Sequence, residues 1–291
     1  MRRKLKRNIV VVLGVLLLLQ FKGTVKADVG TSNSDNEFVK AHSIGRSKGI
    51  LTDDNMTESD FVNLCKNTVY PRYLKYSYEY PGMSFEDYLA EDNYEVPVQT
   101  TEDKPIVINH KSSTASTNKI GLLGVSANRD YKMKAGDILV CYGTSSSSNS
   151  IPNHVGHAAI ASSSSHILEM PNIWSHATHV GKASWFAKHT KGKDYVAVYR
   201  VKKHPHYAED AAGYAYHDMY INNNPKYLLS PNLYDRTTSY CSKYVYCAWY
   251  YGATKDSVKH YNTGHYVLPH SFSGNWKGSF VASYVYKVTE Y

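Results

Sequence analysis

The feature that most constrains this chain is a cysteine and a histidine that lie far apart in the sequence, Cys241 and His157, each at a predicted element of its own. Cys241 follows possible helix caps at 237–239 and precedes apolar residues at helical spacing, which predicts a helix that starts near Cys241. His157 lies in the segment 156–160, Gly-His-Ala-Ala-Ile, whose small side chains predict a strand that another element can approach closely. A chain that uses both side chains must pack the start of this helix against this strand.

A thiol in the first turn of a helix has the surroundings of a nucleophile. It faces backbone N–H groups without helical partners and the positive end of the helix, and both lower the pKa of the thiol below its ordinary value of about 8.5. The same N–H groups can stabilise a developing oxyanion. A thiolate also needs a proton shuttle, and the imidazole of His157 is the candidate for that role. Cys247, further along the helix than Cys241, lacks this position, and we expect it to contribute to packing.

A histidine base needs a partner that orients its second ring nitrogen. Glu169 is the lone charge in the apolar segment 167–170, downstream of His157. A hairpin that turns at 162–165 would bring the Glu169 and His157 side chains next to each other. His154, just upstream of His157, is the alternative base.

Four motifs, in this order along the chain, resemble the YiiX/YebB-like branch of the NlpC-type cysteine hydrolases, which are papain-like proteins with a circularly permuted chain. The motifs are Gly-Asp-Ile-Leu at 136–139, Gly-His-Ala-Ala-Ile at 156–160, Ile-Leu-Glu at 167–169 and Tyr-Cys-Ser-Lys-Tyr-Val at 240–245. Ordinary members of the superfamily place the Cys-Ser helix first, whereas here it comes last, as in the permuted branch. The spacing from the histidine to the third residue also resembles the superfamily and favours His157 over His154.

The resemblance covers residues 131–291 and implies an α+β fold, in which an antiparallel sheet packs against the helix that bears the nucleophile. It implies that Cys241 is the nucleophile, His157 the general base and acid, and Glu169 the orienting third residue. The family's third position varies in residue type, so the role of Glu169 depends most on this chain's own pattern. We interpret 136–137 as structural, forming a tight turn into the central strand.

The first 27 residues have the pattern of a secretion signal. A basic start precedes the apolar run Ile9–Phe21, and the small residues at Val25 and Ala27 predict cleavage after Ala27. The apolar run is shorter than the roughly 20 residues that span a bilayer, which favours a cleaved signal over an uncleaved membrane anchor.

The net charge of the chain depends on this signal. The whole chain has 33 basic and 25 acidic residues, a net charge of +8. Seven of the basic residues and none of the acidic ones lie in 1–27, so the rest of the chain has a net charge of only +1. This near-neutral balance argues against a nucleic-acid partner.

We divide the chain into three parts: the signal at 1–27, an N-terminal leader and mostly helical extension at 28–130, and the permuted papain-like domain at 131–291. The polar composition of 28–49 predicts a flexible leader, and the apolar spacing in 53–94 predicts helices. Within the domain, apolar patterns predict strands at 138–142, 157–162, 166–170, 195–201 and 279–288, and helices at 208–222 and 241–251.

The cysteines and histidines of the chain could also form disulfides or metal sites. Cys241 and Cys247, separated along one predicted helix, point in different directions and cannot bridge, whereas a bond between Cys65 and Cys141 stays open. Three histidine pairs lack the Cys or carboxylate company of a zinc site, so we expect no metal and no other cofactor. The pairs are His176 with His179, His204 with His206, and His260 with His265.

These features predict a secreted cysteine hydrolase that cleaves an amide bond through a thioacyl intermediate. The expected substrate is a peptidoglycan peptide or another amide, and the expected location is extracellular, in association with the cell wall. Two alternatives stay open: an N-acyl or lipid amidase or acyltransferase of the same fold, and a non-catalytic wall-binding module on a decayed hydrolase scaffold. We expect no stable membrane insertion after signal cleavage, and the sequence indicates no oligomeric state.

Overall fold

A computed structural model of the protein describes residues 31–79, 83–98, 104–109, 131–142, 156–192, 194–261, 264–274 and 276–291. The predicted signal at 1–27 and the alternative base His154 lie outside these residues. None of the described helices combines the length and the apolar composition that a membrane crossing needs.

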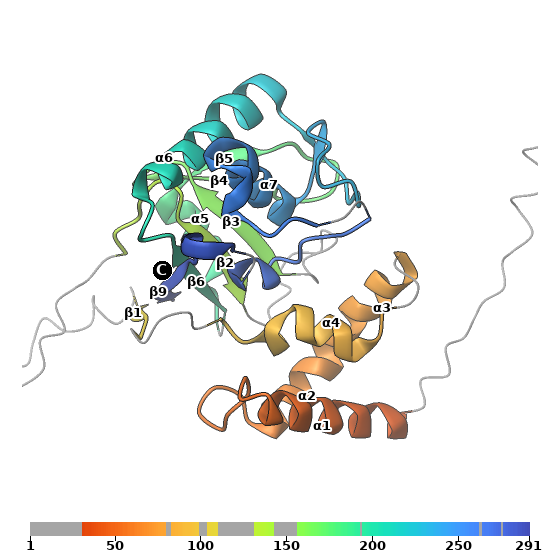
Figure 1. Ribbon diagram of the computed structural model, residues 1–291. Helices are drawn as coiled ribbons and strands as arrows, with labels where there is room; N and C mark the ends of the chain where they lie inside the picture. The colour runs from red at the N-terminus through yellow and green to blue at the C-terminus, as the bar shows by residue number, and fades with distance from the viewer. Residues whose placement is uncertain are drawn as a thin grey trace, which may run out of the picture.

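A seven-stranded sheet lies at the centre of the protein, with the strand order β1-β9-β6-β2-β3-β4-β5 (Figure 1). Neighbouring strands are antiparallel, except that β1 and β9 are parallel. The strands are β1 (Ile106–Asn109), β2 (Ile138–Tyr142), β3 (His157–Ala161), β4 (His166–Glu169), β5 (Thr178–Gly181), β6 (Tyr195–Arg200) and β9 (Ser283–Thr289). Two further short strands, β7 (Lys226–Tyr227) and β8 (Thr238–Ser239), pair in parallel outside this sheet.

The described residues form seven α-helices, four in the N-terminal extension and three in the sheet domain. They are α1 (Thr31–Ser47), α2 (Glu58–Leu64), α3 (Tyr70–Glu79), α4 (Phe85–Glu91), α5 (Lys182–His189), α6 (Pro205–Tyr214) and α7 (Cys241–Cys247). Wider π-helical turns continue α2, α6 and α7 at Cys65–Val69, Ala215–Asn223 and Ala248–Ala253. Short 3-10 turns are found at Asn93–Glu95, Lys255–Ser257, Ser271–Gly274 and Gly278–Phe280.

Helices cover both faces of the sheet because its strands are apolar on both faces, with successive side chains on opposite sides. Val140 and Ala158 belong to the core that the sheet shares with α6 and α7. Their neighbours Leu139 and Ala159 belong to the core on the other side, which includes Trp185 of α5. The start of α7 packs on β3. The predicted α+β class, a mostly antiparallel sheet packed against the helix that bears the candidate nucleophile, is confirmed.

The sheet also contains two strands that the sequence analysis did not find, β1 and β5. β1 lies in the segment 28–130, which we assigned to the extension, and it pairs with β9 at the sheet edge. Its four residues are too short a run to stand out by periodicity. The boundary at residue 131 stays a prediction.

The N-terminal extension is helical from its first described residues, so the prediction of a flexible leader at 28–49 is wrong over Thr31–Ser47, and 28–30 lie outside the described residues. Phe38 and Ala41 of α1 are buried at helical spacing, in a core with Phe61 of α2. The polar average of this segment concealed one apolar face, which is stabilised by packing rather than by composition. Leu268, from the C-terminal part of the chain, belongs to the same core and joins the extension to the sheet domain.

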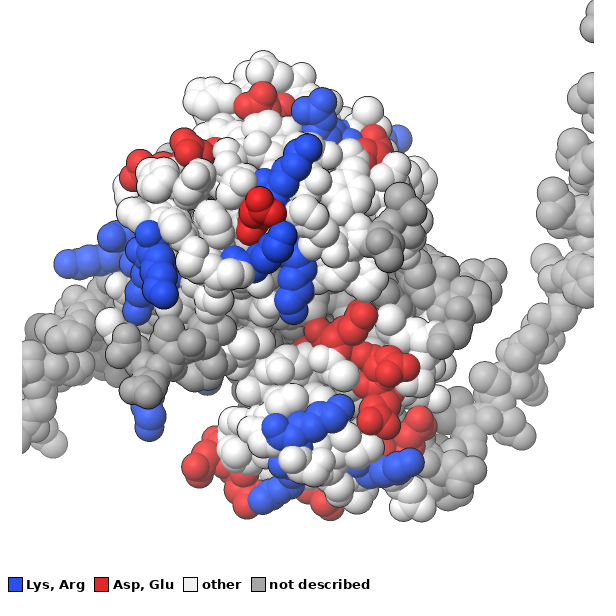
Figure 2. Space-filling view, viewed as in Figure 1, with Lys and Arg blue, Asp and Glu red and all other residues white. Residues whose placement is uncertain are grey.

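The extension is acidic at the end that meets the sheet domain. α4 and the turn that follows it carry the acidic residues Glu86, Asp87, Glu91, Asp92 and Glu95. Figure 2 shows Asp and Glu side chains gathered on the extension close to the sheet domain. α4 is also the extension helix that lies nearest the sheet in Figure 1.

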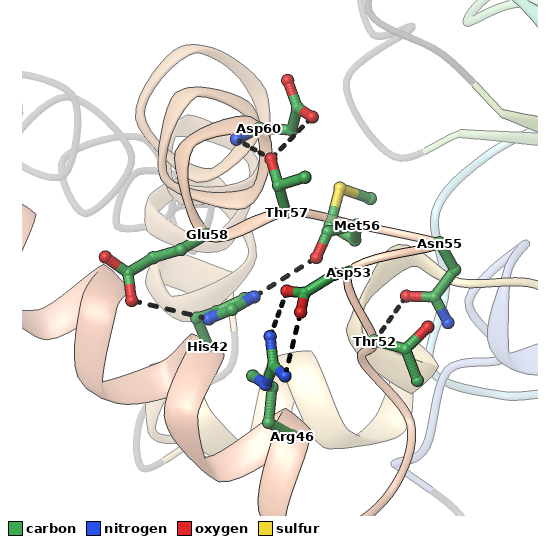
Figure 3. Close-up of polar contacts among 9 residues, drawn as sticks. All are labelled: His42, Arg46, Thr52, Asp53, Asn55, Met56, Thr57, Glu58 and Asp60. Carbon is green, nitrogen blue, oxygen red and sulfur yellow. Dashed lines mark hydrogen bonds and ion pairs between the residues drawn. The ribbon is translucent and has the colours of Figure 1, made fainter.

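Polar contacts hold α1 to the segment that leads into α2 (Figure 3). The Nε2–H group of the buried His42 donates to the backbone oxygen of Met56 at 3.3 Å, and His42 Nδ1 lies 3.8 Å from Glu58 Oε2. Arg46 forms an ion pair with Asp53. These contacts belong to the extension alone.

Gly136 and Asp137 form the tight turn before β2, and their structural interpretation is confirmed. Gly136 has a φ of 81°, and a Cβ atom built on it would lie 2.4 Å from the backbone oxygen of Ala208 in α6. The buried carboxylate of Asp137 accepts hydrogen bonds from Nε and Nη2 of Arg200 in β6, at 2.6 and 2.7 Å. The turn therefore fixes both the approach of α6 and the pairing of the central strands.

Replacing Gly136 with Ala should destabilise the fold by about 2–4 kcal/mol, because the new Cβ combines a backbone clash with a left-handed φ. Gly213→Ala is the matched control, since Gly213 lies in α6 with no atom within 4 Å of its Cβ position. That variant should be neutral or more stable by up to about 1 kcal/mol. Urea unfolding of both variants measures the difference. Equal stabilities would contradict the role given to this turn.

Candidate active site

The three residues selected from the sequence lie together at one end of the central strands. His157 is the first residue of β3, Glu169 is the last residue of β4, and Cys241 is the first residue of α7. β3 and β4 form the predicted hairpin, in which Ala159 is the direct partner of Glu169. His157 lies on the same face as Ala159, so its side chain reaches Glu169 diagonally across the hairpin.

The start of α7 has no side-chain cap, which corrects one expectation. The helix cap is Tyr240, which makes no side-chain capping bond, and not a residue of 237–239. Backbone N–H groups of Ser242 and Ala158 instead donate to the sulfur of Cys241. The cysteine thiolate thus takes the place of a capping oxygen at this helix end.

Two hydrogen bonds to one residue hold the start of α7 in place. The Ser242 hydroxyl donates to the backbone oxygen of Val267 at 2.5 Å. The backbone N–H of Val267 donates to the Tyr240 hydroxyl at 3.1 Å. These bonds flank Cys241 on both sides and fix the direction of its side chain.

A short hydrogen bond joins the candidate base to its candidate orienting residue. His157 Nε2 lies 2.6 Å from Glu169 Oε2, and Glu169 is only 3% exposed. The indole Nε1–H of Trp185 donates to the same oxygen at 2.9 Å. Because Nε2 faces the carboxylate, Nδ1 is the ring nitrogen left for the hydrogen bond that His157 makes with Cys241.

Helix α5 adds side chains that the sequence analysis did not select. Besides Trp185, Lys188 Nζ lies 3.7 Å from Glu169 Oε1, and His189 Nε2 lies 3.5 Å from Glu169 Oε2. The His189 ring also stacks on His157, with 5.0 Å between centroids and an interplanar angle of 11°. The spacing of 185, 188 and 189 places these residues on one helix face, and this is the signal that could have identified them.

The protonation of the site follows from its burial and its contacts. Burial alone would lower the pKa of His157, but its hydrogen bonds with Cys241 and Glu169 outweigh burial and raise the pKa to about 9. Burial would raise the pKa of Cys241, but the bond with His157 and the two backbone N–H groups lower it. Burial would also raise the pKa of Glu169, but His157 and His189 lower it. These shifts favour an ion pair between the Cys241 thiolate and the His157 imidazolium, with the Glu169 carboxylate beside it.

His189 has the opposite character from His157. Burial lowers its pKa to about 4, against the opposing effect of Glu169. His189 is therefore neutral at neutral pH and lies flat against the imidazolium of His157. Its ring can support the plane of His157 without adding a second positive charge.

The four cysteines, all within the described residues, carry thiols rather than disulfides. The bond between Cys65 and Cys141 that the sequence left open is absent, since Cys65 is in the extension core and Cys141 is in β2. Burial raises the pKa of Cys141, and it raises the pKa of Cys247 to about 12. Cys247 is fully packed in α7, as expected.

Two clusters of described residues place metal-ligand atoms within 4.8 Å of one another. One is His157, Glu169 and His189, and the other is Asp92, Glu95 and His270. Each contains a histidine nitrogen at hydrogen-bond distance from a carboxylate, which is the geometry of an ion pair. Among the described residues, the histidine pairs considered in the sequence belong to neither cluster.

Comparison with known proteins identifies one matching family. Residues 104–288, more than half of the chain, match the sequence model of the family described as "Lipoprotein N-acylation protein LnsA-like". An uncharacterized 30.3 kDa protein of Bacillus thuringiensis is 31% identical over 164 residues, which cover 53% of this chain and 58% of that relative. The chain thus spans less than two thirds of the length of this curated relative. No solved structure matches the chain.

Cys241 should be the first cysteine to react with iodoacetamide at pH 7, below the ordinary thiol pKa of about 8.5. Its reactivity should fall only when the pH drops through the lowered pKa of its thiolate. In His157→Ala the burial of Cys241 is no longer opposed by the imidazolium, so the rate at pH 7 should fall at least about tenfold. Peptide mapping by mass spectrometry measures this, with Cys247 as the internal control. Preferential labelling of Cys141 or an unchanged rate in His157→Ala would contradict the ion pair.

Proposed function

We propose that this chain, which belongs to the lipoprotein N-acylation protein LnsA-like family, is an acyl-transfer enzyme that forms a thioester on Cys241. Family membership makes it an enzyme of the acyltransferase or amidase kind. The observation that carries the proposal is the position of Cys241, which is the first residue of α7 and is hydrogen-bonded to His157, whose Nε2 lies 2.6 Å from Glu169 Oε2. A residue that only packs the core has no need of a lowered thiol pKa.

The first half of the proposed reaction loads an acyl group onto the enzyme. The Cys241 thiolate attacks the carbonyl carbon of an acyl ester, and the backbone N–H groups at the start of α7 stabilise the oxyanion that forms. The imidazolium of His157 gives its proton to the departing alkoxide. The products of this step are an alcohol, a thioester on Cys241 and a neutral His157.

The second half transfers the acyl group to an amine. A free amino group attacks the thioester carbonyl while neutral His157 accepts its proton. An amide bond forms, the carbon–sulfur bond breaks, and the Cys241 thiolate returns beside a protonated His157. Glu169 keeps the imidazole in place in both halves, since its carboxylate holds Nε2 at 2.6 Å.

The choice of amine over water as acceptor has two supports. The family description names N-acylation of lipoproteins, so we propose the free amino terminus of a lipoprotein as acceptor. Cys241 is only 7% exposed, and a thioester in such an enclosed position is protected from hydrolysis. The family match therefore favours the acyltransferase alternative over the peptidoglycan hydrolase that the sequence first suggested.

The finer parts of the sequence interpretation remain proposals. The order of elements, with the His157 strand before the Cys241 helix, supports the permuted YiiX/YebB-like branch. We also propose export by the signal at 1–27 and action outside the cytoplasm, where lipoprotein amino termini are exposed. The non-catalytic wall-binding module has less support, because a scaffold that has lost its activity does not need an ion pair between Cys241 and His157.

The proposed reaction can be tested with an acyl-ester lipid as donor and a diacylated lipopeptide with a free amino terminus as acceptor. The full chain should yield the N-acylated lipopeptide, and acid quenching should trap an acyl group on Cys241. Cys241→Ala should lose at least about 10³-fold in rate, and His157→Ala about 10²- to 10⁴-fold. The rate should also fall as the pH rises through about 9, because His157 then loses the proton that the leaving group needs. Mass spectrometry of the lipopeptide follows each rate.

Cys247→Ala is the matched control, because this thiol is buried in the same helix and has a raised pKa. It should keep most of the activity. Product formation by Cys241→Ala would refute the mechanism. Release of soluble fragments from peptidoglycan, without any lipopeptide product, would refute the proposed acceptor. It would support a peptidoglycan hydrolase instead.

A further inference from the structure

A buried histidine joins the N-terminal extension to the sheet domain. His270 is 3% exposed and lies in the segment before the 3-10 turn Ser271–Gly274. Its Nδ1 atom lies 3.1 Å from Asp92 Oδ2 and 3.1 Å from Glu95 Oε2, both in the extension. The two carboxylates are also buried, at 2% and 6% exposure. The extension thus contributes its two innermost acids to a residue of the sheet domain.

The partners of this ring fix its protonation. His270 Nε2 lies 2.8 Å from the backbone oxygen of Cys141, which can only accept, so Nε2 must carry a proton. Nδ1 lies at the same distance from Asp92 and Glu95, and burial raises the pKa of Asp92 to about 7. Burial would lower the pKa of His270, but Asp92 and Glu95 outweigh it and raise the pKa to about 10. His270 is an imidazolium that donates on both sides.

On the sheet side, His270 contacts both neighbours of the candidate base. Cys141, which accepts from His270, is the direct partner of His157 across β2 and β3. Gly156, which precedes His157, has a φ of 72°, and a Cβ atom built on it would lie 2.6 Å from His270 Nε2. The ring is held flat by Tyr142, which stacks on it at 4.2 Å and 7°. The position of the first residue of β3 is therefore set partly by His270.

The extension side shows backbone strain at the same place. Asn93, Tyr94 and Glu95 have φ values of 49°, 53° and 62°, although none is glycine. Left-handed residues of this kind are strained and persist where the surroundings enforce them. This strained turn follows α4 directly and is the segment that delivers Asp92 and Glu95 to His270. The left-handed backbone at 93–95 is therefore coupled to the contact of Asp92 and Glu95 with His270.

We propose that the extension positions His157 for catalysis, with His270 as the link between the acids Asp92 and Glu95 and the strand ends. The inference rests on the proposed function of Cys241 and His157. Asp92 and Glu95 lie upstream of the family match, which begins at residue 104, whereas His270 lies within it. The extension is thus an added part of the catalytic unit, and it is neither a removable cover nor an independent module.

The test uses the full chain and the pH profile of Cys241 alkylation by iodoacetamide, which needs no knowledge of the substrate. His270→Phe keeps a ring to stack on Tyr142 but cannot donate to Cys141. The apparent pKa of Cys241 alkylation should move up by about one unit, so the rate at a pH below the wild-type pKa should fall about tenfold. The triple variant His270→Phe, Asp92→Asn, Glu95→Gln should give the same shift without leaving buried carboxylates unpaired. It replaces the single variant if that one fails to fold.

His42→Phe is the matched control. His42 is also a buried histidine that donates to a backbone oxygen and faces a carboxylate, but all its polar partners lie in the extension (Figure 3). This variant should lower the melting temperature and leave the Cys241 profile unchanged.

Each outcome decides a separate question. An unchanged profile in the folded triple variant, beside a wild type that reacts at pH 7, would overturn the positioning role of His270 alone. A shift of equal size in His42→Phe would also overturn it, since any loss of stability would then suffice. A wild-type Cys241 with an ordinary thiol profile would overturn the proposed function, and the inference with it.

Discussion

The buried carboxylate of Glu169 is the contact on which the candidate site depends. It holds His157 Nε2 at 2.6 Å in surroundings where a lone carboxylate would be very costly, and it therefore requires a positive charge beside it. That charge is the His157 proton, which in turn favours the thiolate of Cys241. The contacts of Trp185 and Lys188 with Glu169 add to the same effect. The ion pair thus follows from one buried acid at the end of β4.

Three parts of the chain converge on this ion pair from different sides. α7 brings the sulfur and its backbone N–H donors, and α5 covers the opposite face of the hairpin with Trp185 and His189. The N-terminal extension reaches the strand ends from a third side through His270. A thioester formed at such a site is enclosed by packed elements, which suits transfer of an acyl group better than its loss to water. The packing around Cys241 therefore excludes solvent, and the proposed reaction requires this exclusion.

Much of this arrangement could be predicted from the sequence. The strand 138–142 has the predicted bounds, and the β3–β4 hairpin brings His157 to Glu169 as the spacing indicated. The helix beginning at Cys241 was also predicted, although its cap was assigned to 237–239 and not to Tyr240. These features could be predicted because they depend on local patterns, namely apolar runs, a hairpin turn and a helix start.

The remaining features depend on contacts between distant residues and had no local signal. α1 was missed because its buried face is narrow and its average composition is polar. The role of His270 follows only when Asp92, 178 residues upstream, is placed beside it. The spacing of Trp185 and His189 indicates a shared helix face, but not that this face stacks on His157. The first choice of substrate also came from resemblance alone, and the family match has shifted it towards acyl transfer.

The most direct test of the account is the protonation state of His157, read by NMR of ¹⁵N-labelled histidine in the full chain. The account predicts that both ring nitrogens carry protons at pH 7 and that the ring titrates near 9. In Cys241→Ala, which lacks the thiolate, this titration should move to lower pH. A His157 ring that is neutral at pH 7 and titrates near the ordinary value of about 6.5 would contradict the thiolate–imidazolium pair.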